Sequence, residues 1–176
     1  MENPRLRRRS VLAMGLAAVA TGSVVSCRRE GPEGLWRSFT NEEARTVDAI
    51  CEQLIPADRD PGARDAGVVN YIDIQLAKRL RKHRPAYRKG LAAVDAASRA
   101  KFGKAFAETT PDRQVEVLKD MEDTNREFFE LILTHTRQGF YGDPRHGGNR
   151  NMASWKMLGL PFPPVRGRQH YESQVG

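Results

Sequence analysis

The sequence predicts an all-α fold: a small bundle of about five helices, followed by an irregular C-terminal extension rich in glycine, proline and aromatic residues. Apolar side chains recur at helical spacing in five successive segments, and no segment alternates apolar and polar residues with the period of two that marks a strand. The chain has 176 residues. The roughly 150 residues that follow the first 27 are enough to bury a core of their own.

Residues 1–27 have the layout of an export signal. Arg8 and Arg9 directly precede an uncharged run, residues 10–26, in which Ala, Gly and Ser are frequent. The order basic, apolar and then small is that of a secretory signal, and adjacent arginines point to the twin-arginine route, which carries folded proteins. An ordinary signal for the general secretory route is the alternative. A permanent membrane span is disfavoured, because it needs about 20 apolar residues.

The signal ends at Cys27 in a sequence, VVSC, that resembles a bacterial lipobox. A lipidated Cys27 would become the first residue of the mature chain, and several acyl chains on it would hold the protein firmly at a membrane. Plain cleavage by signal peptidase near the same place is the alternative. We therefore expect the mature chain on the periplasmic side of the bacterial inner membrane, anchored by lipid.

Residues 28–38 are predicted to be a linker, because they are rich in glycine and charge, and residues 39–138 to be the helical bundle. Thr40 and Glu43 have the spacing of a capping box, with Phe39 at the staple position, so the first helix begins there. Pro56 ends it. The apolar face of this helix is formed by Ala44, Val47, Ile50, Cys51 and Leu54.

The second helix is predicted over residues 67–84, with Val69, Ile72, Leu76 and Leu80 on one face. Its last turns, residues 78–84, are strongly basic. Cations near a helix C-terminus suit the helix dipole, so a solvated helix end is the simplest interpretation. Contact with anionic lipid or with an acidic partner is the alternative.

Three more helices complete the predicted bundle. The third covers residues 85–102. The fourth begins at Thr110 and Pro111, where Thr is a favoured cap and Pro a favoured first helical residue. The fifth covers residues 124–138 and contains a dense group of apolar side chains.

Residues 139–176 form the predicted extension, which is too rich in turn-forming residues to build its own core. It must lie on the bundle or on another protein, and Trp155 fits either place. Because glycines allow close approach and Tyr, Trp and Arg are frequent in interfaces, we predict a partner-binding surface here. Its residues are Phe140, Tyr141, Gly142, Asp143, Pro144, Gly147, Gly148, Asn149, Arg150, Trp155 and Lys156.

Motifs for chemistry are missing from the sequence. It has no glycine-rich phosphate loop and no HExxH or EF-hand spacing, and its two cysteines are too few for a Cys₄ zinc site. Cys51 lies on the apolar face of the first helix and is interpreted as a small core residue, and His135, inside the fifth helix, as a packed or partly exposed structural histidine. Three aspartates near residue 60 suit turns better than a weak cation site. We therefore expect no catalytic residue, cofactor or metal site in this chain.

The net charge of +7 does not indicate a nucleic-acid partner. Residues 1–26 account for +3 of it, since they contain four arginines and one glutamate. The remaining charge is small and distributed along the chain, whereas nucleic-acid binding needs a concentrated basic patch on the folded domain. We therefore expect no nucleic acid among the partners.

Five short segments together resemble the gluconate 2-dehydrogenase subunit 3 family. They are residues 54–58 (LIPAD), 65–73 (DAGVVNYID), 139–144 (GFYGDP), 147–150 (GGNR) and 155–159 (WKMLG). The order of the motifs is specific, although each alone would be weak. The likeness extends over most of the chain beyond the signal.

The resemblance implies an accessory subunit without a cofactor of its own. Its implied partners are an FAD-containing large subunit of the glucose-methanol-choline type, a multihaem cytochrome c subunit and, during export, the twin-arginine translocase. FAD and haem c would thus belong to the partner subunits. The competing interpretation is a stand-alone periplasmic lipoprotein or binding module without an enzyme partner. An enzyme in its own right is disfavoured by the missing motifs.

Overall fold

The computed structural model describes residues 34–160. The predicted export signal with Arg8 and Arg9, the predicted lipidation site at Cys27 and the last part of the predicted extension lie outside these residues. The described chain includes the whole predicted bundle and every segment that carries the family resemblance.

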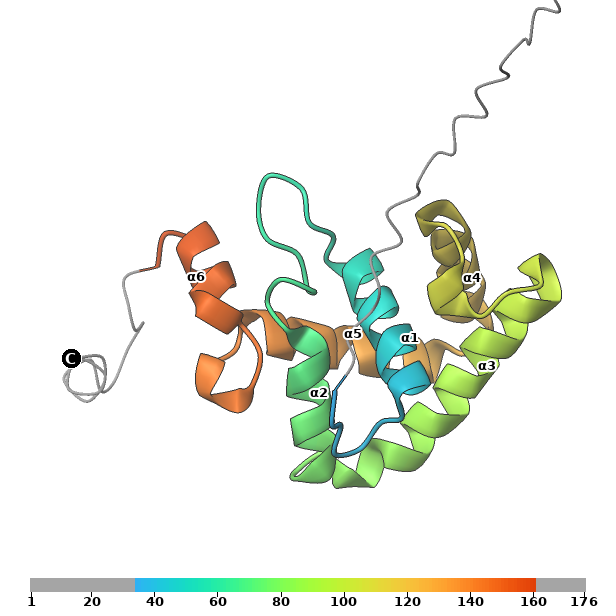
Figure 1. The fold of residues 1–176 in the computed structure, drawn as a ribbon, viewed down its shortest axis with the longest axis horizontal. Helices are drawn as coiled ribbons and strands as arrows, with labels where there is room; N and C mark the ends of the chain where they lie inside the picture. The colour runs from blue at the N-terminus through green and yellow to red at the C-terminus, as the bar shows by residue number, and fades with distance from the viewer. Residues whose placement is uncertain (1–33, 161–176) are drawn as a thin grey trace, which may run out of the picture.

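The described chain is all-α, as predicted, and a long loop, residues 55–67, joins its first two α-helices (Figure 1). The α-helices are α1 (Asn41–Leu54), α2 (Val68–Ala77), α3 (Arg84–Phe102), α4 (Pro111–Thr124), α5 (Arg126–Tyr141) and α6 (Ala153–Met157). Short 3₁₀ turns lie in three of the connections: η1 (Arg81–His83) between α2 and α3, η2 (Phe106–Glu108) between α3 and α4, and both η3 (Pro144–His146) and η4 (Arg150–Met152) between α5 and α6. No helix in this part of the chain combines the length and the apolar character that a bilayer span requires.

The predicted capping box at the start of α1 is confirmed. The Thr40 hydroxyl accepts a hydrogen bond from the Glu43 N–H (3.1 Å), and the Glu43 carboxylate accepts one from the Thr40 N–H (2.8 Å). These two bonds satisfy backbone donors that a helix start leaves without partners. The helix ends at Leu54, one residue before Ile55-Pro56, as predicted.

The helix predicted over residues 67–84 is too long, because α2 ends at Ala77. At Lys78 the backbone leaves the helical region, and Leu80 turns its N–H back to the Gln75 carbonyl (2.8 Å). The Arg84 guanidinium then donates from Nε to the Leu76 carbonyl (2.9 Å), which caps the end of α2. The basic run is therefore a surface turn between α2 and α3 and not the end of a helix.

The fifth helix continues beyond the predicted end at residue 138. Gly139 presses against Tyr71, where a Cβ would lie 2.9 Å from Cδ1 of the ring, and Phe140 is only 1% exposed. Glycine has a low helix propensity, and we attribute the continuation of α5 past Gly139 to its packing against α2. The start of the predicted extension is also more regular than expected, since it contains η3, η4 and α6.

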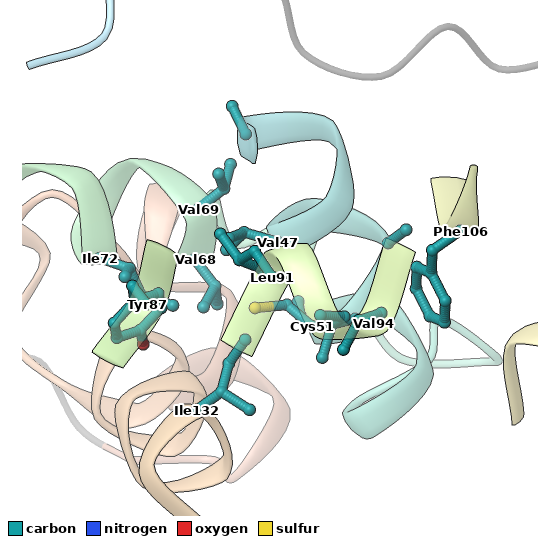
Figure 2. Packing of buried hydrophobic residues seen from close by; sticks show 14 of the residues in the cluster. Val47, Cys51, Val68, Val69, Ile72, Tyr87, Leu91, Val94, Phe106 and Ile132 are labelled. Carbon is teal, nitrogen blue, oxygen red and sulfur yellow. The ribbon is translucent and has the colours of Figure 1, made fainter. Parts of the chain in front are cut away.

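The core lies around α1, which contacts α2, α3, α4 and α5. Figure 2 shows its side chains converging from these helices, among them Val47, Ile72, Leu91 and Ile132. Every buried member of this hydrophobic cluster lies within residues 44–140. Burial of each large side chain stabilises the fold by roughly 1.5–3 kcal/mol.

Candidate functional site

The folded chain brings the segments of the family resemblance to one end of the molecule. The Arg150 N–H donates to the Ala66 carbonyl (2.9 Å), and the Asn70 amide donates to the Gly147 carbonyl (2.7 Å). Residues 55–67, the start of α2 and α6 lie together at this end (Figure 1). We call residues 139–160 the C-terminal motif.

Asn149 holds the C-terminal motif in its shape. It is fully buried and has a left-handed backbone conformation, with φ of 43°. Its amide Nδ2 donates to the Gly142 carbonyl (2.9 Å), while Oδ1 accepts from both the N–H and the hydroxyl of Ser154. Because Asn tolerates this backbone region better than most residues, the sequence can place an amide here at modest cost. One side chain thereby joins the end of α5 to the start of α6.

Two glycines are required where the motif crosses the helices. A Cβ on Gly148 would collide with the carbonyl oxygen of Gly139, to which the Asn149 N–H donates (2.8 Å). Gly147 has φ of 99°, and a Cβ there would lie 2.6 Å from Cδ1 of Ile74. At Gly148 the motif therefore lies directly on the backbone of α5, and at Gly147 it packs against the side chains of Ile74 and Asn70 on α2.

Trp155 belongs to this chain's own packing. It is 9% exposed, and its indole N–H donates to the Tyr141 carbonyl (3.0 Å). The ring attaches α6 to the end of α5. Of the two places that the sequence allowed for Trp155, the structure shows the one on the bundle.

The eleven residues predicted to contact a partner divide into a buried and an accessible group. Phe140, Gly148, Asn149 and Trp155 are buried and face the interior. Accessible or partly accessible are Tyr141, Gly142, Asp143, Pro144, Gly147, Arg150 and Lys156. The interface itself remains a prediction, and only the second group can take a direct part in it.

A depression of about 520 Å³ lies beside the exposed Tyr141. Aromatic, basic and amide side chains line it, so it offers both apolar surface and hydrogen-bond donors. The lining residues are Tyr71, Arg79, Leu80, Arg137, Gln138, Tyr141, Gly142 and His146. They come from α2, α5, the turns after these helices and the start of the C-terminal motif.

A second depression, of about 480 Å³, lies between α6 and the loop after α1. Charges of both signs line it: Asp60 and Asp65 on the loop, and Arg150 and Lys156 on the motif. The Arg150 guanidinium lies over Gly67, where a Cβ would come within 3.1 Å of Nη2. Such a mixed lining suits polar groups of another protein better than one small charged ligand.

Exposed apolar side chains gather around the same end. Tyr141 is 45% exposed, Leu158 53% and Leu160 41%. Single exposed apolar residues are ordinary on a soluble protein. Three of them within one motif, next to two depressions, are typical of a surface that another protein covers.

The buried groups that resemble catalytic residues stay neutral. Burial raises the pKa of the Cys51 thiol to about 12, and its sulfur lies 3.2 Å from the Thr136 hydroxyl. Burial, with a smaller effect of the neighbouring His83, lowers the pKa of His135 to about 4. Nδ1 of His135 lies 2.9 Å from the Tyr87 hydroxyl. Cys51 is a core residue, as predicted, and of the two positions predicted for His135, packed or partly exposed, the structure shows the packed one.

The aspartates near residue 60 act as turn residues. Asp58 accepts from the Asp60 N–H (2.9 Å), and Asp65 accepts from the Gly62 N–H (3.1 Å). Within residues 34–160, no three side chains of metal-binding type come together in a possible ion site.

Two buried carboxylates, Asp48 and Asp73, were not anticipated from the sequence. Asp73 of α2 is 2% exposed and accepts hydrogen bonds from the backbone N–H groups of Arg37, Ser38 and Phe39 at 2.8–3.3 Å. It fastens the segment before α1 to α2. An acidic residue within the apolar sequence VVNYIDIQL was the available signal, although no pattern there indicates its partners.

Comparison with known proteins identifies the family. The family model for gluconate 2-dehydrogenase subunit 3 matches residues 41–161, about two thirds of the chain. These residues include the whole bundle and every segment that carried the resemblance. No curated protein and no solved structure matches the chain. The chain belongs to the gluconate 2-dehydrogenase subunit 3 family.

Proposed function

We propose that the chain is the non-catalytic small subunit of a periplasmic, membrane-associated, FAD-dependent dehydrogenase complex. Its role there is to support export, maturation and stability of the flavin subunit. The observation that carries this proposal is the family match over residues 41–161. The name of that family describes one subunit of a multisubunit dehydrogenase, so association with other subunits is its direct implication.

The proposed contact surface is the accessible part of the C-terminal motif. Tyr141, Leu158 and Leu160 expose apolar area there, and Arg150 and Lys156 add hydrogen-bond donors. The buried contacts of Asn149 and Trp155 hold this surface in one conformation before any partner binds. Such preorganisation lowers the entropy lost on docking.

The proposed division of labour leaves the chemistry to the partners. FAD on the large subunit would accept electrons from the alcohol, and the multihaem cytochrome c subunit would pass them on. In this chain the Cys51 thiol, with its pKa of about 12, is not a nucleophile at neutral pH. The substrate is determined by the flavin subunit.

The export signal proposed at Arg8 and Arg9 gives the test of this function. A folded flavin subunit bound to this chain would cross the membrane with it, because the twin-arginine route accepts folded cargo. Replacing both arginines with lysine should leave both proteins in the cytoplasm, as measured by fractionation. Normal periplasmic delivery of both would contradict the proposal.

The proposed lipid anchor at Cys27 is tested separately. Cys27→Ala should release the protein from membranes into the soluble periplasmic fraction, because the acyl chains supply most of the attachment. Mass spectrometry of the mature N-terminus measures the modification directly. An unmodified N-terminus at another residue would refute the anchor and leave the subunit assignment intact.

A further inference from the structure

Beyond the signal, positive charge is not distributed evenly along the chain, as the small net charge suggested, but is concentrated in the connection between α2 and α3. Residues 78–89 contain seven Lys and Arg and no Asp or Glu. Residues 34–160 contain 21 basic and 18 acidic residues, so the described chain outside residues 78–89 has a net charge of −4. Six of the seven basic side chains are exposed, and we call these six the basic end. They are Lys78, Arg79, Arg81, Lys82, Arg88 and Lys89.

The basic end has no acidic partner within the described part of the chain. The ion pairs found there join other residues, and Arg79 donates to the neutral amide of Gln75 (2.8 Å). Arg84, the seventh basic residue, is partly buried and donates to the Leu76 carbonyl and to the Ser38 hydroxyl. Six like charges so close in sequence repel one another, and an anionic surface outside the chain would relieve this repulsion.

The N-terminal segment is fastened at this same end. Asp73 accepts from the backbone of Arg37 and Ser38, and Nη2 of Arg84 donates to the Ser38 hydroxyl (3.1 Å). Figure 1 shows the segment before α1 bending back beside the end of α2, next to the start of α3. Arg37 and Ser38, from which the chain leads back to residue 27, therefore lie next to the turn that carries the basic end.

The far end of α3 carries the opposite charge. Residues 108–130, which include α4, contain eight acidic and three basic residues. The acidic side chains of α4 lie next to the end of α3, because Lys101 forms ion pairs with Glu116 (2.8 Å) and Asp120 (2.6 Å). The 19 residues of α3 separate the two ends by about 28 Å. A negatively charged surface would attract one end and repel the other.

We infer that the basic end binds the anionic headgroups of a phospholipid membrane and orients the subunit with α4 away from it. The choice of lipid over an acidic protein rests on the proposed anchor at Cys27. Residue 27 precedes Arg37 by ten residues, which reach about 35 Å at most. A lipid anchor there keeps the basic end close to headgroups, where an acyl chain and a polybasic patch together give stable attachment.

The test is vesicle binding by residues 28–176 without any acyl group. This fragment retains the whole buried cluster, and circular dichroism checks that it is helical. We expect it to bind vesicles of equal parts phosphatidylglycerol and phosphatidylcholine, and not vesicles of phosphatidylcholine alone. Binding should decrease with added salt, because screening shortens the reach of the charges.

Two charge-matched variants make the test specific for the basic end. The first carries Arg81→Gln, Lys82→Gln, Arg88→Gln and Lys89→Gln. The second carries Arg99→Gln, Lys104→Gln, Lys119→Gln and Arg126→Gln, four exposed positions outside the basic end. Binding to anionic vesicles should fall by on the order of 100- to 1,000-fold in the first variant and by a few-fold at most in the second.

Three results would overturn the inference: no preference for anionic vesicles, equal losses in both variants, or unchanged vesicle binding in the first variant. A first variant that keeps vesicle binding but loses the flavin subunit would assign the basic end to an acidic protein instead. The measurement needs neither lipidation nor a partner. If the fragment binds anionic vesicles but the full chain purifies without flavin, the proposed function is refuted and the inference about the basic end stands.

Discussion

At the scale of single residues, Asn149 has the most consequential position in the C-terminal motif. Its side chain makes three hydrogen bonds within the protein, to Gly142 and Ser154, and no part of it is exposed. Removing a partner of a buried polar group costs more than the bond contributes, because the remaining group stays unsatisfied. The motif therefore depends on one amide.

Asn149→Ala should lower the free energy of unfolding by about 2–4 kcal/mol, measured by urea denaturation. The change leaves the Gly142 carbonyl and the Ser154 N–H without their partner. Asn151→Ala is the matched control, because Asn151 also has a positive φ (55°) but is exposed. The control should cost less than about 1 kcal/mol. Equal losses in the two variants would assign the effect to backbone strain and not to the amide.

His135 gives the fold a dependence on pH. Its pKa of about 4 in the folded chain lies below the ordinary value of 6.5. As pH falls below about 6.5, the unfolded chain binds a proton that the folded chain does not yet bind. Stability contributed by the neutral ring above pH 6.5 is therefore lost progressively toward pH 4, by up to about 3 kcal/mol.

His135→Gln should flatten the dependence of the unfolding free energy on pH over this range. Glutamine can form a hydrogen bond with the Tyr87 hydroxyl, as His135 does, but it has no titrating group. The measurement is the free energy of unfolding of both proteins between pH 7 and pH 4. Parallel slopes for the wild type and His135→Gln would show that the buried ring is not responsible.

At the scale of elements, local signals in the sequence predicted helix starts better than helix ends. The capping box at Thr40 and the Thr110-Pro111 pair depend on neighbouring residues, so they are readable from the sequence alone. The end of α2 and the continuation of α5 through Gly139 depend on Arg84 and Tyr71, which are distant in sequence. Tertiary contacts there override propensity.

The sequence predicted which residue types form the proposed contact surface, but not which of their side chains point outward. Glycines, prolines and aromatic residues marked residues 139–176 as an extension that must lie on the bundle or on another protein. Nothing in the pattern showed that Trp155 donates to a carbonyl of its own chain, or that Tyr141 and Leu158 stay exposed. The orientation follows from where α5 ends and how Asn149 turns the chain. A test of the interface must therefore use the exposed residues and not Trp155.

Replacing Tyr141 and Leu158 together with serine should weaken association with the flavin subunit by about 30-fold or more, because exposed anchors of this kind contribute about 2 kcal/mol. The thermal midpoint of the isolated subunit should change little, because about half of each side chain is exposed. Val115→Ser removes another exposed apolar side chain, on α4, and should leave association unchanged. Intact association of the double variant would place the interface elsewhere.

At the scale of the whole molecule, structure and charge suggest a division into two functional ends. The segments of the family resemblance, two depressions and exposed apolar side chains occupy one end. The N-terminal segment and the basic residues occupy the α2–α3 turn, and Arg79 lines one of those depressions. A partner bound at the C-terminal motif would thus lie near the membrane surface that the basic end is inferred to contact.

The central claim is that this chain works as a subunit of a flavin-dependent dehydrogenase complex. The most direct measurement is to purify the tagged chain from its native membranes in mild detergent and to record the absorption spectrum of what comes with it. We expect stoichiometric flavin and c-type haem, together with dye-linked dehydrogenase activity. Recovery of the intact chain alone, without flavin or haem under conditions that preserve membrane complexes, would contradict the claim.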